Sequence, residues 1–371
     1  MSTPFPRRRT RAVRAGKLII GGGEPISVQT MTKTDTRDVG RTVEQILRLE
    51  DMGLSLIRCA VPDMEAARAL GKILEQIHVP LAADIHFDFR LALEALEQGV
   101  NKLRLNPGNI QERDKISQIA RKAGGMGVPI RIGVNAGSLP EALRSKHGGI
   151  TAEAMVESAL EEVAVLESAG FGDIVISLKA SDIPLTVQSY RLLAGRCPYP
   201  FHAGITEAGT QYPGSIRSAA GIGILLSEGL CDTIRVSLTA DPAEEVRTAY
   251  RILEALDLAK RGPLLISCPT CGRTEIDLLS LAAAVEKKLE KVTAPIRVAV
   301  MGCVVNGPGE AREADVGIAG GKGSGILFRR GQVVRTLSES ELLSALMEEI
   351  EKMSGDAPSC QDCFPGPDKG A

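Results

Sequence analysis

The chain has 371 residues, of which 44% are hydrophobic and 24% charged, and its formal net charge is −2. This length suits two domains, and no run of about 18 apolar residues indicates a membrane-spanning helix. The small net charge and the absence of Trp argue against nucleic acid as a partner. Eight cysteines without a secretory signal indicate reduced thiols in the cytoplasm, serving as core residues or metal ligands.

Residues 1–25 form an arm that contains a basic run from Arg7 to Arg11. No apolar segment follows this run, so it does not read as a secretory signal. We expect a solvated tail, and the alternative is a structured element.

Residues 26–259 alternate short β-branched runs with longer segments of helical period. Glycine often follows the helical segments, as expected at helix ends. Helices are predicted, for example, over Val39–Met52, Met64–Ile77, Phe89–Gln98, Ala152–Ala169 and Pro242–Leu256. Eight strands are predicted at Ile26–Thr30, Ser55–Ala60, Leu81–Ile85, Lys102–Leu105, Ile130–Val134, Asp173–Leu178, Phe201–Ile205 and Thr233–Leu238.

Strands that alternate with helices pair in parallel through right-handed crossovers. Eight such units predict an α/β fold with an N-terminal (β/α)8 TIM-type barrel. The competing architecture is an open doubly wound sheet, which carries a glycine-rich phosphate motif after its first strand. Here Gly21, Gly22 and Gly23 precede the first strand, which favours the barrel.

The carboxyl ends of the barrel strands carry a set of cations and polar side chains, and chemistry in such barrels occurs at this end. Buried charges of one sign are costly without compensation, and arginine suits phosphate oxygens. We therefore expect a small substrate with two or more phosphate groups, although some of the arginines could instead pair with carboxylates. The candidate substrate-binding residues are Arg58, Arg104, Arg131, Asn135, Lys179, Thr206, Arg235 and Ser237.

Glu207 is the acidic residue of this set. A carboxylate in a cationic pocket can donate or accept a proton, which makes Glu207 a catalytic candidate. The alternative is an ion pair with Arg235 or Lys179. Asp84 and His86 are weaker candidates, which either contact the ligand or order the rim.

The pattern of residues 264–353 predicts a second domain of α+β type. A domain boundary is expected at Lys260–Pro263, which contains Gly and Pro. Residues 354–371 read as a flexible tail. Strands are expected at Leu264–Ser267, Ile296–Gly302 and Asp315–Ala319, a hairpin over Gly325–Thr336, and helices at Asp277–Lys291 and Glu339–Met353.

Two motifs in this domain carry cysteines directly after predicted strands. Cys268 and Cys271 form a Cys-x-x-Cys pair, and Cys303 opens a segment that reaches Glu310. Three thiolates suit an iron–sulfur cluster, and a glycine-rich turn lets Glu310 reach the same metal. A carboxylate is a hard donor on a soft cluster, so we expect it to be exchangeable and the fourth iron to be open to substrate.

Zinc is the alternative cofactor, because Cys-Pro-x-Cys-Gly also occurs in zinc sites and a second Cys-x-x-Cys lies at Cys360 and Cys363. The two pairs are much farther apart than the usual spacing of about 15–20 residues. This alternative describes a zinc-stabilised phosphate-binding barrel protein without redox activity. A pterin-dependent transferase is a third reading, although pterin pockets need neither the cations nor the cysteines.

The motifs together resemble the 4-hydroxy-3-methylbut-2-enyl diphosphate synthase family (IspG/GcpE) of non-mevalonate isoprenoid biosynthesis. The resemblance covers roughly residues 7 to 353 and matches the short bacterial form. It rests on Ser267-Cys-Pro-Thr-Cys-Gly-Arg273, Met301-Gly-Cys-Val-Val-Asn-Gly-Pro-Gly-Glu310, Ser27-Val-Gln-Thr-Met-Thr32, Arg104-Leu-Asn-Pro-Gly-Asn109, Ile132-Gly-Val-Asn135, Ser177-Leu-Lys-Ala-Ser181, Gly204-Ile-Thr-Glu-Ala-Gly209 and Arg235-Val-Ser-Leu-Thr239.

The resemblance implies a reductive ring opening and dehydration of 2-C-methyl-D-erythritol 2,4-cyclodiphosphate, with flavodoxin or ferredoxin as electron donor. It implies one 4Fe-4S cluster per chain, held by Cys268, Cys271, Cys303 and Glu310, and a proton-donor role for Glu207. The diphosphate is expected on the rim residues named above. The tail with its extra cysteine pair departs from the family pattern.

The linker after the last barrel helix is about six residues and spans at most about 20 Å. That reach is shorter than the barrel with its loops, so we expect the cluster domain not to reach its own barrel mouth. This predicts a head-to-tail homodimer, consistent with the family, in which each cluster caps the barrel of the other chain.

Overall fold

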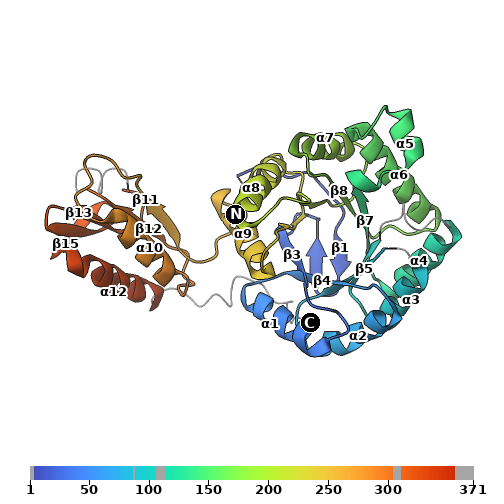
Figure 1. Ribbon diagram of the computed structural model, residues 1–371, viewed down its shortest axis with the longest axis horizontal. Helices are drawn as coiled ribbons and strands as arrows, with labels where there is room; N and C mark the ends of the chain where they lie inside the picture. The colour runs from blue at the N-terminus through green and yellow to red at the C-terminus, as the bar shows by residue number, and fades with distance from the viewer. Residues whose placement is uncertain (1–3, 87, 106–112, 304–310, 356–371) are drawn as a thin grey trace, which may run out of the picture. The chain divides into compact units, whose positions relative to one another are not determined.

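The computed structural model describes residues 4–86, 88–105, 113–303 and 311–355. The chain forms two compact units, Met1–Ala259 and Lys260–Ala371 (Figure 1). None of the helices in the described segments is long and apolar enough to cross a membrane.

Eight parallel strands form the centre of the first unit (Figure 1). They pair in the order β8-β7-β6-β5-β4-β3-β10-β9, and a bridge between Ile176 and Phe201 joins the two ends of the sheet. This closure confirms the predicted TIM-type barrel. The strands are β3 (Ser27–Met31), β4 (Leu56–Ala60), β5 (Leu81–Ile85), β6 (Lys102–Leu105), β7 (Ile130–Asn135), β8 (Ile174–Lys179), β9 (His202–Ala203) and β10 (Thr233–Ile234).

Strands β9 and β10 are much shorter than the sequence pattern predicts, with two residues each. The reason lies at Gly204, directly after β9. A Cβ atom at this position would lie 2.5 Å from the carbonyl oxygen of Arg235. Only glycine permits so close an approach of these two backbone segments, and the regular pairing of β9 with β10 ends here.

A ring of helices surrounds the strands (Figure 1). Aspartate side chains cap the amino ends of five of these helices by accepting hydrogen bonds from backbone N–H groups of the first turn. These residues are Asp38, Asp63, Asp88, Asp182 and Asp241. The helices are α1 (Val39–Asp51), α2 (Met64–Leu74), α3 (Phe89–Glu97), α4 (Arg113–Met126), α5 (Glu141–Lys146), α6 (Ala152–Ser168), α7 (Ile183–Ala194), α8 (Gln211–Ser227) and α9 (Pro242–Ala255).

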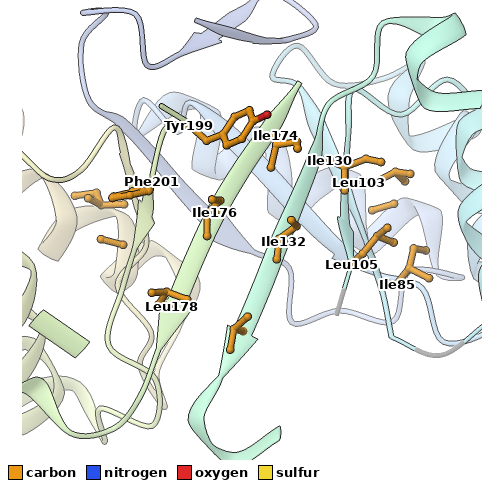
Figure 2. Close-up of a cluster of buried hydrophobic side chains, with 14 of the residues drawn as sticks. Ile85, Leu103, Leu105, Ile130, Ile132, Ile174, Ile176, Leu178, Tyr199 and Phe201 are labelled. Atoms are coloured by element: carbon orange, nitrogen blue, oxygen red, sulfur yellow. The ribbon is translucent and has the colours of Figure 1, made fainter. Parts of the chain in front are cut away.

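The main hydrophobic core lies between the strands and this ring of helices. Figure 2 shows its strand side, where Ile130 and Ile132 of β7 neighbour Ile174, Ile176 and Leu178 of β8. Because side chains alternate along a strand, the residues between these apolar positions point into the barrel. Outward-facing apolar residues therefore leave the intervening positions free to carry the polar groups of the barrel interior.

A hairpin of β1 (Val13–Ala15) and β2 (Leu18–Ile20) belongs to the amino-terminal arm. Its buried residues form a separate apolar cluster with Leu56, Ala82 and Val175. These three lie near the amino ends of β4, β5 and β8, on the inward-facing positions. The hairpin therefore covers the amino-terminal end of the barrel interior.

The expectation that the arm is a solvated tail is wrong. The Arg7 guanidinium donates to Asp232 at 2.8 Å, across 225 residues of sequence. Arg8 lies 3.9 Å above the centre of the Phe201 ring and donates to carbonyl oxygens, among them that of Cys197 at 2.6 Å. Such long-range partners leave no local pattern in the sequence.

The second unit contains one mixed sheet, with strand order β11-β12-β13-β14-β15. The first three strands are parallel and the last two antiparallel. Helices α10 (Leu278–Leu289) and α12 (Leu342–Gly355) share a hydrophobic core with this sheet. The strands are β11 (Leu264–Ser267), β12 (Arg297–Met301), β13 (Val316–Gly321), β14 (Ser324–Arg329) and β15 (Gln332–Ser338). The predicted small α+β domain and its hairpin are confirmed.

Candidate functional site: a cationic barrel interior and a cysteine-bearing loop pair

The interior of the barrel is lined by charged and polar residues rather than by the branched apolar residues usual in such barrels. Strand registers place candidate residues on neighbouring inward positions: Arg104 of β6 lies beside Arg131 of β7, and the neutral Asn135 of β7 lies beside Lys179 of β8. The buried polar and charged residues of the strands are Ser27, Gln29, Thr30, Arg58, Asp84, Lys102, Arg104, Arg131, Ser177, Lys179, His202 and Thr233.

Asp84 is the carboxylate that joins two of the predicted substrate-binding arginines. Its Oδ1 accepts from Arg104 Nη1 at 2.9 Å, and its Oδ2 lies 3.5 Å from Arg58 Nε. Burial opposes ionisation of Asp84, but the charge of Arg58, together with His86 and Arg104, outweighs burial and lowers the pKa of the Asp84 carboxyl. Asp84 therefore stays charged and orders the rim, which is one of the two roles expected for it.

Arg235 is held by a second carboxylate, Glu245, which lies in the first turn of α9 and was not predicted from the sequence. Glu245 Oε2 lies 3.5 Å from Arg235 Nη2, and Oε1 accepts the backbone N–H of Leu238 at 3.0 Å. The other neighbours of this buried carboxylate are Thr30, which donates its hydroxyl, and Lys33 at 3.4 Å. Glu245 thus fixes the loop after β10 against β3.

Three cations of the interior have no carboxylate partner among the described residues. Arg131 Nη1 donates to Ser177 Oγ at 3.2 Å, and Lys179 Nζ lies 3.3 Å from His202 Nε2. Lys102 Nζ is buried and has no hydrogen-bond partner within the segments that the structure describes. Neither Lys102 nor His202 was predicted as a site residue, although both lie on inward-facing strand positions.

Burial is the main electrostatic cost for these groups. It lowers the pKa of the Lys102 ammonium well below its usual value, and the charges of Arg131 and Arg58 lower it further. Burial and the neighbouring Arg131, Arg235, Arg58 and Arg104 act on Lys179 in the same direction. The pKa of His202 is also lowered, by burial and then by Lys179 and its neighbours, so His202 is neutral.

The remaining predicted residues lie at or just beyond the carboxyl ends of the strands. Asn135 is the last residue of β7, and Thr206 donates its backbone N–H to Ala180 O at 3.4 Å. Ser237 follows β10 and is half-buried. The structure thus brings all eight candidate substrate-binding residues to the interior or mouth of one barrel.

Glu207 follows Thr206 at this mouth and is exposed. Its φ is 53°, in the left-handed region that residues other than glycine rarely adopt. Arg235 pairs with Glu245, and Lys179 contacts His202. In the described part of the chain, Glu207 therefore forms no ion pair with either cation, contrary to the alternative interpretation. Backbone strain of this kind is typical of residues held in place for function.

In the second unit, Cys268 and Cys303 follow the neighbouring parallel strands β11 and β12. The two loops are hydrogen-bonded to each other: Gly302 donates its N–H to Cys268 Sγ at 3.3 Å, and Glu275 donates to Gly302 O at 3.2 Å. Gly302 is tightly enclosed, because a Cβ there would lie 3.0 Å from Thr274. The hydrogen bonds therefore hold the loop that carries Cys303 against Cys268.

Cys271 is the exposed thiol of this set. Hydrogen bonds from the backbone and side chain of Arg273, with the charge of Arg273 and a hydrogen bond from Thr274, lower its pKa and favour the thiolate. Thiolates are the ligands of iron–sulfur clusters, so the described cysteines fit such a cluster chemically. Within the described ranges, no group of three His, Cys, Asp or Glu side chains is arranged to hold a single metal ion.

Three further predicted residues, Glu310, Cys360 and Cys363, lie outside the described residues. Cys59 and Cys231 are buried and Cys197 is half-buried, so these three take the role of core residues, one of the two roles expected for the cysteines. Burial raises the pKa of Cys59 to about 12, so this thiol stays protonated.

Family models match both units. The model of the GcpE TIM-barrel domain matches residues 10–250, and that of the GcpE protein C-terminal domain matches residues 264–352. The chain belongs to the GcpE family of 4-hydroxy-3-methylbut-2-enyl diphosphate synthases. This confirms the resemblance deduced from the cysteine and barrel motifs.

Curated relatives in this family match over nearly their whole length. A protein of Geobacter sulfurreducens is 57% identical over 94% of this chain and 98% of its own. One of Clostridium tetani is 54% identical over 94% of this chain and 99% of its own. Both are named 4-hydroxy-3-methylbut-2-en-1-yl diphosphate synthase (flavodoxin). The alternative of a zinc-stabilised barrel without redox activity finds no support among these relatives.

Solved structures of dihydropteroate synthases also resemble the GcpE barrel. The enzyme of Yersinia pestis is 14% identical over 67% of this chain and 99% of its own, with a TM-score of 0.48. These values are too low to support a conclusion about function, so the pterin-dependent alternative gains nothing from them.

Proposed function

We propose that this chain catalyses the reductive ring opening and dehydration of 2-C-methyl-D-erythritol 2,4-cyclodiphosphate to 4-hydroxy-3-methylbut-2-enyl diphosphate, in non-mevalonate isoprenoid biosynthesis. Two electrons and two protons enter. The ring C–O bond at the tertiary carbon breaks, the neighbouring hydroxyl leaves as water, and a carbon–carbon double bond forms. The observation that carries the proposal is the excess of buried cations in a GcpE-type barrel.

The barrel interior suits a ligand with two negative phosphates. Arg131 and Lys179 have no carboxylate partner in the described part of the chain, and arginine forks match phosphate oxygens. Arg58 and Arg104 are oriented by Asp84, and Arg235 by Glu245. Asn135, Thr206 and Ser237 add neutral hydrogen-bonding groups at the mouth. We assign the diphosphate to these residues.

We assign Glu207 the role of proton donor to the leaving hydroxyl oxygen. Its exposed position at the mouth keeps it in reach of solvent protons, and its backbone is held in the left-handed region. A carboxylic acid so placed lowers the barrier for loss of water, an effect typically worth about 10²–10⁴-fold in rate.

We further propose that Cys268, Cys271, Cys303 and Glu310 hold one 4Fe-4S cluster per chain. When bound, this cluster would pass the two electrons of the reduction one at a time, with the external electron donor re-reducing it in between. The hydrogen-bonded loops carry Cys268 and Cys303, and the Arg273 contacts lower the pKa of the Cys271 thiol. Flavodoxin, which the relatives' names give as their partner, is the proposed electron donor, and the cytoplasm is the proposed location.

The proposed assembly is a head-to-tail homodimer in which the two units of one active site come from different chains. Two variants test the function and the assembly together. Cys303→Ser should lose the cluster absorbance and turnover, whereas Glu207→Gln should keep the cluster and lose turnover. Mixed dimers of the two should regain one working site. A fully active Glu207→Gln enzyme would refute its proton role, and mixtures that stay inactive would count against shared sites.

A further inference from the structure

Two lysines lie inside the barrel without a carboxylate partner in the described segments. Lys102 opens β6 and is 1% exposed, and Lys179 ends β8 and is 7% exposed. Lys102 Nζ has no hydrogen-bond partner among the described residues. In the described part of the chain, the hydrogen-bond partner of Lys179 Nζ is a neutral imidazole, His202 Nε2, at 3.3 Å.

Their charged neighbours are nearly all cationic. Lys102 is flanked by Arg131 of β7 and Arg58 of β4. Lys179 faces Arg131, Arg235, Arg58 and Arg104, in addition to His202. The carboxylates of this interior are Asp84 and Glu245, and both are already engaged with arginines. Tyr190, Lys33, His86 and Glu207 complete the titratable groups around or above this interior.

The charge balance of this interior depends on the state of the two lysines. Six cations against two carboxylates leave an excess of four positive charges if every group is ionised. Arginine does not lose its proton in proteins, whereas a buried lysine readily does. With both lysines neutral, the excess falls to two.

We propose that Lys102 and Lys179 are binding residues that enter the complex with proton uptake: they are neutral amines in the empty barrel and ammonium groups when the dianionic ligand is bound. Two protons and two negative charges then enter together, and the net charge of the interior stays the same. Lys102 is thereby added to the residues of the site. The inference rests on the proposed function, since it takes the cyclodiphosphate as ligand.

The ligand itself neither releases nor takes up protons. In the cyclodiphosphate each phosphorus carries ester and anhydride bonds and a single ionised oxygen, so the ligand is a dianion throughout the neutral range. Protons that disappear from solution on binding must therefore bind to the protein. Glu207, the exposed carboxylate at the mouth, is the competing acceptor, and a Glu207→Gln variant removes it without touching the lysines.

Isothermal titration of the anaerobic holoenzyme with the cyclodiphosphate measures this uptake. Without reductant the ligand binds but is not turned over. The titration is run at pH 7.5 in three non-phosphate buffers of different ionisation enthalpy. The observed binding enthalpy should vary linearly with the ionisation enthalpy of the buffer, and the slope should give an uptake of about one to two protons per ligand. The affinity should fall about tenfold for each unit by which the pH rises and for each proton taken up.

Variants assign the uptake to residues. Lys102→Met should take up about one proton less than the parent, while Glu207→Gln should keep the parent value. Lys72→Met, at an exposed lysine of α2, is the matched control and should change nothing. If Lys102→Met does not fold, Lys102→Gln and the pH dependence of the parent's affinity carry the same information.

The outcomes separate the inference from the function on which it rests. Ligand binding with an uptake below about half a proton, or with proton release, overturns the inference and leaves the proposed function intact. An uptake in Lys102→Met that equals the parent's removes Lys102 from the site, and an uptake that vanishes in Glu207→Gln assigns it to the carboxylate instead. No binding in any buffer would overturn both.

Discussion

Replacing Asp84 by asparagine removes the charge that holds Arg58 and Arg104 together while keeping the size of the side chain. The carboxylate is 4% exposed and the two arginines 8% and 7%. Breaking a buried ion pair by removing one partner costs about 3–5 kcal/mol, because the remaining charge is left uncompensated. Here two guanidiniums lose their shared partner, so we expect a loss within or above that range.

The tyrosines make the assay specific to the barrel unit. The chain has no Trp and four Tyr, at Tyr190, Tyr199, Tyr212 and Tyr250, all of which lie in the first unit. Tyrosine fluorescence in urea therefore follows unfolding of the barrel alone. At a slope of about 3 kcal/mol per molar urea, Asp84→Asn should lower the midpoint by about 1 M or more.

Asp63→Asn is the matched control for this substitution. Asp63 pairs with Arg37 at 3.2 Å on the surface, where both side chains are more than 40% exposed. Asparagine at this position can still cap α2, and exposed pairs contribute little, so the midpoint should stay within error. An Asp84→Asn midpoint as high as that of the control would refute the reasoning that Asp84 compensates a buried charge.

Two further predictions concern the barrel. Gly204→Ala should abolish cyclodiphosphate binding and leave the cluster absorbance unchanged. The added Cβ would lie 2.5 Å from Arg235 O and 3.0 Å from Lys179 Nζ. An unchanged affinity in titration would contradict this. Arg7→Met should lower the urea midpoint at pH 8, and less so near pH 5. Burial raises the pKa of Asp232, and an unpaired Asp232 destabilises the folded state less once it is protonated. A pH-independent loss would show that the Arg7–Asp232 charge pair is not the cause.

The sequence predicted the barrel well because its strands are short, regular and separated by amphipathic helices. Strands β5 and β6 have the predicted bounds, since their apolar positions alternate with the inward Asp84 and Arg104. The prediction took only the carboxyl ends of the strands as functional, and so it missed Lys102, which opens β6 and lies two residues before Arg104.

Other features depend on contacts that are far apart in sequence. Glu245 lies in the first turn of a helix, where an acidic residue usually has a local explanation, and nothing nearby in sequence indicates that it holds Arg235. Arg7 likewise finds its partner 225 residues away. A basic run alone cannot be distinguished from a solvated tail without that partner.

The most direct test of the account is anaerobic turnover of the cyclodiphosphate by the purified chain with a chemical reductant. The account predicts formation of 4-hydroxy-3-methylbut-2-enyl diphosphate with consumption of two electrons per product, by protein whose iron and sulfide contents match one 4Fe-4S cluster per chain. Protein that carries this cluster and consumes no cyclodiphosphate, or protein that binds only zinc, would contradict it.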